Sequence, residues 1–193
     1  MIRTRAALSV ALVELMVAQG FDDITVQQVL DRARVGRATF YAHFRSKQDL
    51  LLSDAERFCE MLERQFLAKA SGSRRLAPVA ELFTHVREYH RFLGALQRSS
   101  MNREVFDLLT GYLARIITAR ISMLAPAGRA GTLSPAATAR VLAAALTELM
   151  GWWLERGAPQ EPEVMDAQFH ELAWGGLART LPVGAPQSRF STG

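Results

Sequence analysis

The stretch over residues 25–50 constrains the fold more than any other part of the chain, because it predicts two short helices joined by a tight turn and then the start of a third helix. Thr25 has a side chain that caps helices, and Gln28 stands three residues later, where a capping box places the residue that returns the bond. Ile24 and Val29 fall at the two positions of a hydrophobic staple. These signals start the first helix directly after Thr25 and predict a helix-turn-helix.

Hydrophobic periodicity separates an inner from an outer face on this motif. The inner residues recur at helical spacing or plug the turn, and they are Val26, Val29, Leu30, Ala33, Val35, Phe40 and Phe44. The outward and turn positions between residues 32 and 47 hold no acid and include Arg32, Arg34, Arg37, Arg45, Lys47, Thr39, Tyr41 and His43. Such a surface suits phosphates and base edges, so it predicts DNA contact over a merely solvated face. Arg37 is the expected base contact, whereas Arg34 has pairing with Asp31 as an alternative.

This motif resembles the N-terminal domain of the TetR family of bacterial transcriptional regulators. The similarity covers roughly the first quarter of the chain and rests on Gly20-Phe21, Ile24-Thr25-Val26, the run Val35 to Phe44, Lys47 and Leu50-Leu51. In that family the helix carrying Thr39-Phe40-Tyr41 is the recognition helix, which enters the major groove. The resemblance implies DNA contact at Thr25, Gly36, Arg37, Ala38, Thr39, Tyr41, His43 and Lys47.

Two positions depart from the family pattern. The turn carries Arg34 where the family usually has Gly, and the recognition helix opens with Gly36 where the family usually has Ser or Thr. Both changes weaken local structure, since left-handed backbone disfavours side chains and Gly is a weaker cap. They leave open an alternative, a TetR-like sensor or partner-binding protein that does not dock on DNA. For single residues, Thr39 bonding its own helix and Tyr41 as half-buried core are further alternatives, as is His43 as an ordinary surface histidine.

Charge is distributed unevenly along the chain. Residues 1–47 hold seven Arg or Lys against four Asp or Glu, while residues 48–193 hold sixteen against fifteen. A positive head on a near-neutral body fits a DNA-binding module attached to a part with another task. The single cysteine, Cys59, excludes an intramolecular disulfide and favours a reducing, cytoplasmic location.

The N-terminal region has some features of a signal peptide, because Arg3 and Arg5 precede an apolar run. Glu14 interrupts that run, and no small-residue cleavage site precedes Gly20. Apolar residues also recur at helical spacing at Leu8, Leu12, Leu15 and Met16, so we expect an amphipathic helix. No uncharged apolar stretch reaches ~18 residues, so no membrane span is expected.

The rest of the chain predicts only helices. Capping and periodicity predict a helix from Ser46 to about Ala70 and a single helix over residues 79–96, followed by a break at Ser99-Ser100. The next helix is predicted to end near Pro126-Ala127-Gly128, before a loop at 131–134. Ser134 and Pro135 open a helix that ends near Gly157, and a last helix runs from Pro162 to Pro182. The fold class is therefore all-α, with about nine helices. The expected domains are a DNA-binding domain at 1–46, an effector-binding and dimerisation domain at 47–181, and a flexible tail at 182–193.

The C-terminal part resembles the end of one TetR subgroup in Trp152-Trp153-Leu154-Glu155-Arg156-Gly157, Pro162-Glu163, Met165, Phe169-His170 and Leu172. In the family the last two helices pack against their copies in a second subunit as a four-helix bundle. Two adjacent Trp residues lie about 100° apart on a helix, so one of them is expected to face a partner. The expected homodimer interface comprises Leu149, Trp152, Trp153, Met165, Phe169 and Leu172.

The body of the chain holds no pattern of catalytic residues, so we expect no enzyme activity and no cofactor. Glu81 and His85 share a helix face but have no visible third ligand, so no metal site is expected. Aromatic residues are dense there, which predicts an apolar effector pocket among Phe58, Leu62, Phe66, Phe83, His85, Tyr89, Phe92, Leu109, Tyr112, Leu113 and Ile116. More of these aromatics are expected in the core than in the pocket.

The resemblance to the TetR family implies a homodimeric DNA-binding regulator that acts as a repressor on a palindromic double-stranded operator. The resemblance implies that a small hydrophobic effector in the body tilts the DNA-binding domain and releases the DNA.

Overall fold

The computed structural model describes residues 2–124 and 134–180, with side chains described from residue 4 to 176 within those ranges. These residues form nine helices and no strand. They are α1 (Ile2–Gln19), α2 (Val26–Ala33), α3 (Arg37–Tyr41), α4 (Lys47–Ala70), α5 (Val79–Glu88), α6 (His90–Gln97), α7 (Asn102–Leu124), α8 (Pro135–Glu155) and α9 (Pro162–Thr180). The all-α prediction is confirmed.

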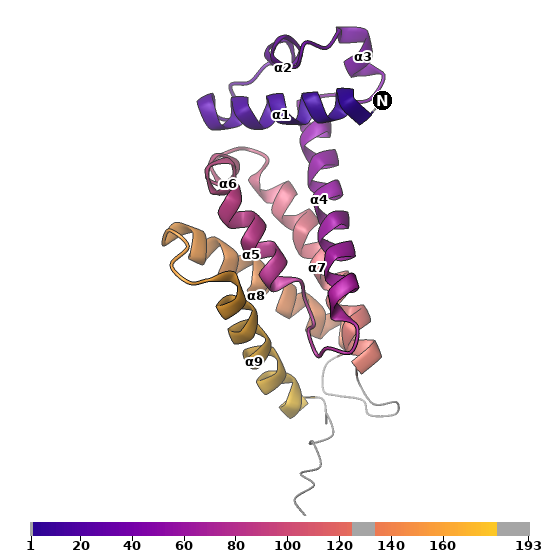
Figure 1. The fold of residues 1–193 in the computed structure, drawn as a ribbon, viewed down its shortest axis with the longest axis vertical. Coiled ribbons are helices and arrows are strands. Elements are labelled where there is room, and N and C mark those ends of the chain that lie inside the picture. The colour runs from indigo at the N-terminus through magenta and orange to yellow at the C-terminus, as the bar shows by residue number, and fades with distance from the viewer. Residues whose placement is uncertain (1, 125–133, 181–193) are drawn as a thin grey trace, which may run out of the picture.

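The helices form two parts that share α4 (Figure 1). Helix α1 lies across one end of the molecule, with α2 and α3 on its outer side. Helix α4 begins under α1 and runs away from it through the body, where α5 to α9 pack. Helix α6 lies directly below α1, and the two helices are in contact. None of the helices in the two described ranges has the length and hydrophobicity needed to cross a bilayer.

The caps that the sequence predicts are present. The backbone N–H of Gln28 donates to Thr25 Oγ1 at 3.2 Å, and the N–H of Thr25 donates to Gln28 Oε1 at 2.7 Å, which closes a capping box at the start of α2. Ser46 caps α4 and Ser134 caps α8, whose first turn contains proline as predicted.

The prediction of one helix over residues 79–96 is wrong. The chain forms α5 and α6 with a break at Tyr89, whose φ of −108° and ψ of 22° leave the helical region. Hydrophobic periodicity continues across Tyr89, so the sequence pattern does not predict a helix break there. The cause is tertiary, because α5 packs into the core of the body while Ala95 and Leu96 of α6 join the core beneath α1.

Other helix ends deviate little or fall outside the described residues. The break at Ser99-Ser100 is present, and α7 starts there three residues before the first apolar residue used to predict it. Gly20 has the positive φ, 82°, expected of a residue that ends a helix. The predicted end near Pro126-Ala127-Gly128, residues 131–133 of the predicted loop, Pro182 and the tail at 182–193 lie outside the described residues.

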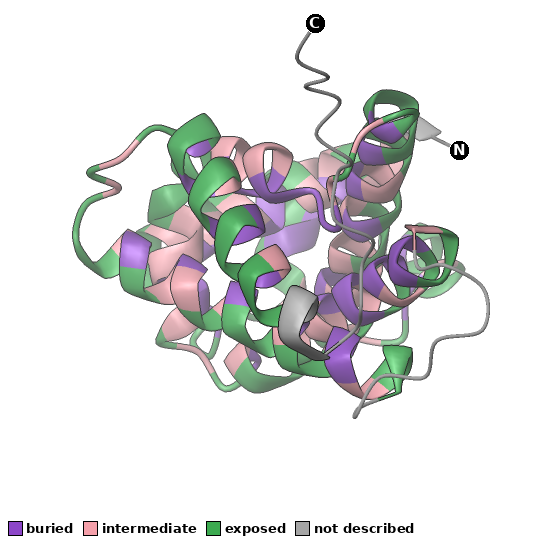
Figure 2. Ribbon diagram, turned by 90° about the horizontal axis from the view of Figure 1, so that it is seen from below, coloured by how far each residue is buried: buried purple, intermediate pink, exposed green. Residues whose placement is uncertain are grey.

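Buried residues form two main clusters on the facing sides of the helices (Figure 2). The body cluster joins α4, α5, α7, α8 and α9. The N-terminal cluster joins α1 to α3 with the first turn of α4, and it also takes in Ala95, Leu96 and Met101 from the body. The N-terminal part is thus packed against the α6–α7 region as well as carried on α4.

A charge network fastens α9 to the segment before α5. Arg75 Nη2 donates to Glu81 Oε2 and to Asp166 Oδ1, both at 2.6 Å. Burial opposes the charged form of each carboxyl, but the hydrogen bonds and charge of Arg75, aided by His170 at Asp166, outweigh burial and lower the pKa of Glu81 and of Asp166. His170 Nε2 accepts from the N–H of Leu76 at 2.9 Å on the same seam.

We predict that Arg75→Met lowers the free energy of unfolding by about 2 to 3 kcal/mol, because two largely buried carboxylates lose their cation. The figure lies below that of a fully buried pair because the Arg75 side chain is 21% exposed. Both carboxyl pKa values are lowered in the folded state, so this stabilisation is present at neutral pH and is lost as pH falls through the lowered values. Denaturant titrations at pH 7 and below about pH 4 should show the loss shrinking in acid.

The matched control is Arg87→Met, which breaks an exposed, solvent-screened pair with Glu161 and should cost much less than Arg75→Met. Equal losses in the two variants would contradict the assigned role of Arg75.

Candidate nucleic-acid interface and ligand cavity

The turn between α2 and α3 closes despite both departures from the family pattern. Arg34 adopts the left-handed conformation, with φ 54° and ψ 45°. The N–H of Val35 donates to the carbonyl of Leu30 at 3.0 Å, and the N–H of Arg34 donates to that of Asp31 at 3.3 Å. Gly36 occupies the N-cap of α3 without a side-chain bond. The departures therefore cost stability and leave the path of the chain unchanged.

Helix α3 presents a continuous exposed face. Phe40 is completely buried and anchors the helix in the N-terminal cluster. Its neighbour Tyr41 is 52% exposed, which removes the alternative that Tyr41 is a core residue. The other predicted DNA contacts of this helix and its cap, Gly36, Arg37, Ala38 and Thr39, are exposed as well. The side chain of Thr39 makes no hydrogen bond within the described residues.

The remaining predicted DNA contacts flank this face. Thr25 is exposed, although its hydroxyl is occupied by the capping box. His43 is half-buried with its ring 6.3 Å from that of Phe44. Lys47 Nζ donates to the carbonyls of Phe21, Asp22 and Ile24 at 2.7, 3.0 and 2.6 Å. A phosphate contact by Lys47 therefore requires one of these three bonds to be exchanged.

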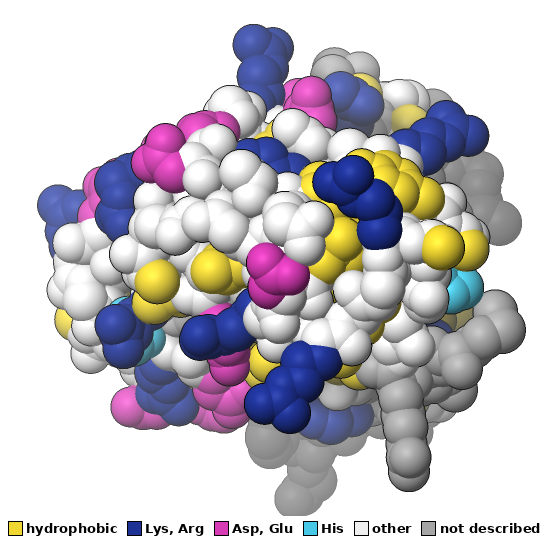
Figure 3. Space-filling view, turned by 90° about the horizontal axis from the view of Figure 1, so that it is seen from above, with side chains coloured by type: hydrophobic (Ala, Val, Ile, Leu, Met, Phe, Trp, Pro, Cys, Tyr) yellow, Lys and Arg dark blue, Asp and Glu magenta, His cyan; other side chains and the backbone are white. Residues whose placement is uncertain are grey.

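Several cations surround α3, but they are not equally free. Figure 3 looks onto this end of the molecule and shows Lys and Arg side chains spread over it, with acidic side chains among them. Arg32 Nε donates to Glu14 at 2.6 Å. The alternative pairing of Arg34 with Asp31 is absent from the described side chains, where Asp31 accepts from Gln27 Nε2 at 2.8 Å. Arg34 and Arg37 thus remain without a carboxylate partner in the described part of the chain.

We predict that Arg34→Gly raises the free energy of unfolding by about 0.5 to 1 kcal/mol, because Gly removes the left-handed backbone cost and keeps the turn. Arg34→Ala is the control: it removes the same charge and keeps the backbone cost. Thermal unfolding of both variants should rank Gly above Ala. If Ala stabilised as much as Gly, charge repulsion and not backbone strain would be the cause.

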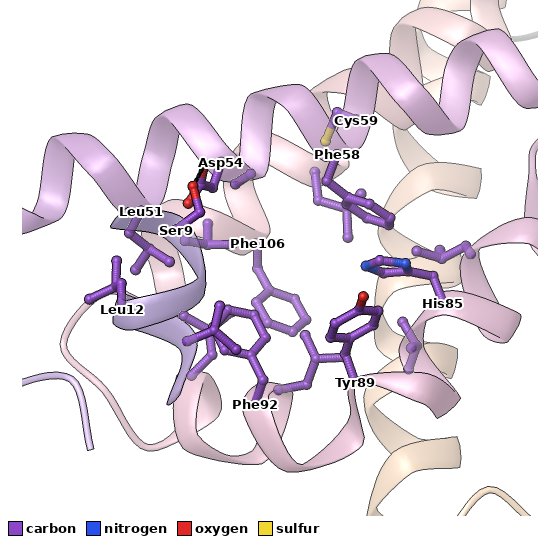
Figure 4. A pocket seen from close by; sticks show the side chains of 18 of the residues that line it. Ser9, Leu12, Leu51, Asp54, Phe58, Cys59, His85, Tyr89, Phe92 and Phe106 are labelled. Atoms are coloured by element: carbon purple, nitrogen blue, oxygen red, sulfur yellow. Dashed lines mark hydrogen bonds between the residues drawn. The ribbon is translucent and has the colours of Figure 1, made fainter. Parts of the chain in front are cut away.

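A cavity of about 440 Å³ lies where the N-terminal part meets the body. Its walls come from α1, α4, α5, α6 and α7, with Met150 from α8 (Figure 4). The residues predicted from sequence that line it are Phe58, His85, Tyr89, Phe92 and Leu109. The lining also includes Ser9, Leu12, Leu51, Asp54 and Phe106, which the sequence analysis did not select.

The other residues predicted for the pocket lie elsewhere. Leu62, Phe83 and Leu113 are buried in the body cluster, and Phe66 packs with Ile116 and Ala70 in a small separate cluster. The guanidinium of Arg115 stacks on the ring of Tyr112, 4.3 Å from the centroid of that ring. The contribution of α1 had no local signal, because it depends on how α1 and α6 pack across a long sequence separation.

Apart from Glu14, the polar side chains of the mainly apolar cavity wall lie at two positions. At one end Ser9 Oγ donates to Asp54 Oδ1 at 2.7 Å, which links α1 to α4. At the other end the His85 ring is stacked between Phe58, at 4.2 Å, and Tyr89, at 4.4 Å. Burial lowers the pKa of His85, so its imidazole is neutral at pH 7. Burial also raises the pKa of the Cys59 thiol to about 12, which leaves it unreactive.

The predicted dimer residues divide into two groups. Trp153, Met165 and Phe169 are buried in the core of their own chain, and Trp153 Nε1 donates to the carbonyl of Gln160. Trp152 is 39% exposed and Leu172 is 76% exposed. Leu149 is half-buried on the same helix as Trp152. The adjacent Trp pair therefore splits as its 100° separation requires, with one ring inward and one outward.

No group of side chains suited to a metal ion occurs in the part of the chain described here. Glu81, considered with His85 as a ligand pair, is held by Arg75 at 2.6 Å, and His85 is held in its aromatic stack.

Comparison with known proteins agrees with this geometry. Residues 8–53 match the family described as "Bacterial regulatory proteins, tetR family". No curated protein matches the sequence.

Solved structures share the fold across nearly the whole chain. The dihydroxyacetone kinase operon activator DhaS is 17% identical with a TM-score of 0.68, covering 94% of this chain and 99% of its own. The fatty acid degradation regulator FadR from Bacillus halodurans is 16% identical with a TM-score of 0.66, covering 91% and 97%. A TetR transcriptional regulator from Streptococcus agalactiae is 20% identical with a TM-score of 0.64, covering 88% and 93%.

At such identities the structural likeness concerns the fold, whereas the match over residues 8–53 identifies the helix-turn-helix itself. Regulators of this kind are transcription factors and not enzymes. Residues 8–53 thus form a helix-turn-helix domain of the TetR family of bacterial regulatory proteins, and the whole chain shares its fold with solved regulators of that family.

Proposed function

We propose that this protein is a homodimeric repressor that binds a palindromic operator and releases it when a small, mainly apolar effector enters the cavity between α1 and the body. The observation that carries the proposal is the exposed face of α3, anchored by buried Phe40 and set at an intact turn. In this proposal residues 1–46 bind DNA and contribute α1 to the cavity wall, while residues 47–181 supply the rest of the cavity and bind the second subunit.

On DNA, α3 enters the major groove with its N-terminus foremost. Arg37 stands in the first turn, exposed and without a carboxylate partner in the described residues, so it suits bidentate bonding to a guanine. Tyr41, Thr25 and His43 flank it and suit phosphates. Lys47 holds the loop before α2 through three carbonyls, which orients the flank even if it never meets a phosphate.

The coupling between effector and DNA uses contacts that join the two parts. Ser9 meets Asp54 across the α1–α4 seam, and the N–H of Ser100 donates to Asp22 at 3.1 Å across the seam with the α6–α7 turn. Ser9 and Asp54 line the cavity, and α1, α4 and α6 all contribute to its wall. A ligand that prefers one separation of these helices therefore biases the orientation of α3.

The alternative is a TetR-like sensor that does not dock on DNA because its turn is degenerate. Two features favour docking. The turn keeps its hydrogen bonds at Arg34 and Val35, and an Arg in place of Gly adds a cation next to the groove-facing helix.

We predict that Arg37→Ala flattens the sequence preference of the protein, at a cost of about 1 to 3 kcal/mol for the base pair that Arg37 contacts. Tyr41→Phe removes only a hydroxyl and should weaken all sequences alike, by about 0.5 to 1.5 kcal/mol. Mobility shifts with the DNA flanking its own gene, at several salt concentrations, measure both. Tyr112→Phe, in the body, is the control for loss of a hydroxyl. Wild-type binding by both N-terminal variants would place the DNA contacts elsewhere, and no salt-dependent shift with the wild type would favour the sensor.

A separate prediction concerns the dimer. Trp152→Glu and Leu172→Glu should each split the protein into monomers, because a dry interface does not accept an unpaired charge. Both side chains are exposed in the single chain, so their replacement spares its core. Met123→Glu, on α7 and 73% exposed, is the matched control and should remain dimeric. Sedimentation velocity measures all three, and dimers in both α8 and α9 variants would move the interface to another face.

A further inference from the structure

The cavity wall carries acidic side chains but no basic ones. Twenty-one residues line the cavity, and none of them is Arg or Lys. Its histidine, His85, is neutral at pH 7 because burial lowers its pKa. The acids Glu14 and Asp54 both line it. The wall therefore offers no cation to a carboxylate or phosphate, and it offers two anions.

Asp54 is the acid that faces the cavity without a compensating charge. Among the described residues its side chain accepts one hydrogen bond, from Ser9 at 2.7 Å, which leaves acceptor positions on both carboxylate oxygens. Arg5 and Arg57 are near enough to favour its charge, but neither forms an ion pair with it in the described residues. Arg5 instead donates to Ser53 at 3.1 Å and lies over Phe44. Burial is the largest influence on Asp54 and raises its pKa, as expected of a carboxylate that lacks a partner.

Glu14 differs from Asp54 in both respects. It is exposed, and it pairs with Arg32 at 2.6 Å. Its charge is thus already balanced by a cation and by water. Of the two acids, only Asp54 lacks a cationic partner on the cavity side.

The part of the cavity near His85 suits a flat apolar group of a ligand. Phe58, His85 and Tyr89 form a stack with interplanar angles of 23° and 28°. Phe92 and Phe106 line the cavity as well (Figure 4). Planar rings pack against such walls by offset stacking or edge contacts. Figure 4 shows Asp54 on one side of the cavity and His85 and Tyr89 on the other, so an occupant between them meets a carboxylate and aromatic rings.

We propose that the effector is a lipophilic amine whose protonated ammonium group binds Asp54 at the α1–α4 seam. The amine is aliphatic and is attached to a flat apolar group. This inference rests on the proposed function, and it names the ligand class of the same cavity. The ammonium donates to the carboxylate of Asp54, which already accepts from Ser9. The flat apolar part of the ligand lies between the aromatic stack and Phe106. A carboxylate of the same shape would place its charge beside that of Asp54 with no cation in the wall, and the two like charges would repel.

Three compounds that differ only in the head group test this assignment: 2-(1-naphthyl)ethylamine, 2-(1-naphthyl)ethanol and 1-naphthylacetate. Titration calorimetry on the full chain at pH 7.5 should give binding in the order amine, alcohol, carboxylate. Asp54→Asn keeps an acceptor for Ser9 and removes the charge. It should weaken the amine by about tenfold or more, as expected for loss of a charge-assisted hydrogen bond, and leave the alcohol within about threefold.

Glu14→Gln is the matched control and should leave amine binding within about threefold, because its carboxylate is already paired. Retained alcohol binding by the Asp54 variant shows that its cavity is folded. Three results would overturn the proposal: tightest binding of the carboxylate, equal amine binding by wild type and Asp54→Asn, or equal losses in the Asp54 and Glu14 variants.

A mobility shift with the same compounds separates this inference from the proposed function. If the amine binds through Asp54 and leaves the operator bound, the amine site stands and the repressor mechanism fails. If the alcohol or the carboxylate binds best and releases the operator, the mechanism stands and the amine assignment fails.

Discussion

Helix α4 belongs to two hydrophobic cores at once, and the rest of the structure depends on this. Leu50 and Leu51 are buried with α1 to α3, while Cys59 and Leu62 are buried with the body. The helix has 24 residues, so it spans about 36 Å as one hydrogen-bonded rod. Neither core can shift along it without exposing apolar surface. The orientation of the DNA-binding domain is therefore set by how α1 and α6 meet beside this rod.

Polar contacts hold that meeting point. Ser9 and Asp54 join α1 to α4, Asp22 and Ser100 join the loop before α2 to the α6–α7 turn, and Lys47 ties that same loop to the start of α4. Ala95 and Leu96 of α6 add apolar packing against the same N-terminal cluster. Packing is not directional, but hydrogen bonds are, so the polar contacts select one orientation among those that the packing permits.

The sequence predicted what depends on local chemistry and missed what depends on packing over long distances. The capping box of Thr25 and Gln28 lies within four residues, so it was predictable, as was Pro135 in the first turn of α8. The break at Tyr89 was not, since the hydrophobic period runs through it. The cavity shows the same division: aromatic residues of the body pointed to Phe58 and Tyr89, but nothing near Ser9 reveals that α1 closes the other wall.

The position of the cavity has a consequence for regulation. A cavity lined only by the body would need a relay of side chains to reach DNA, whereas this one has α1 of the DNA-binding domain in its wall. Its shape must change whenever α1 moves relative to α4, so the affinity of an occupant depends on the orientation of α3. Such a difference in affinity between two orientations is the whole of the coupling free energy, and it acts equally in both directions. If the proposed effector weakens DNA binding by a given factor, DNA that holds the other orientation weakens effector binding by the same factor.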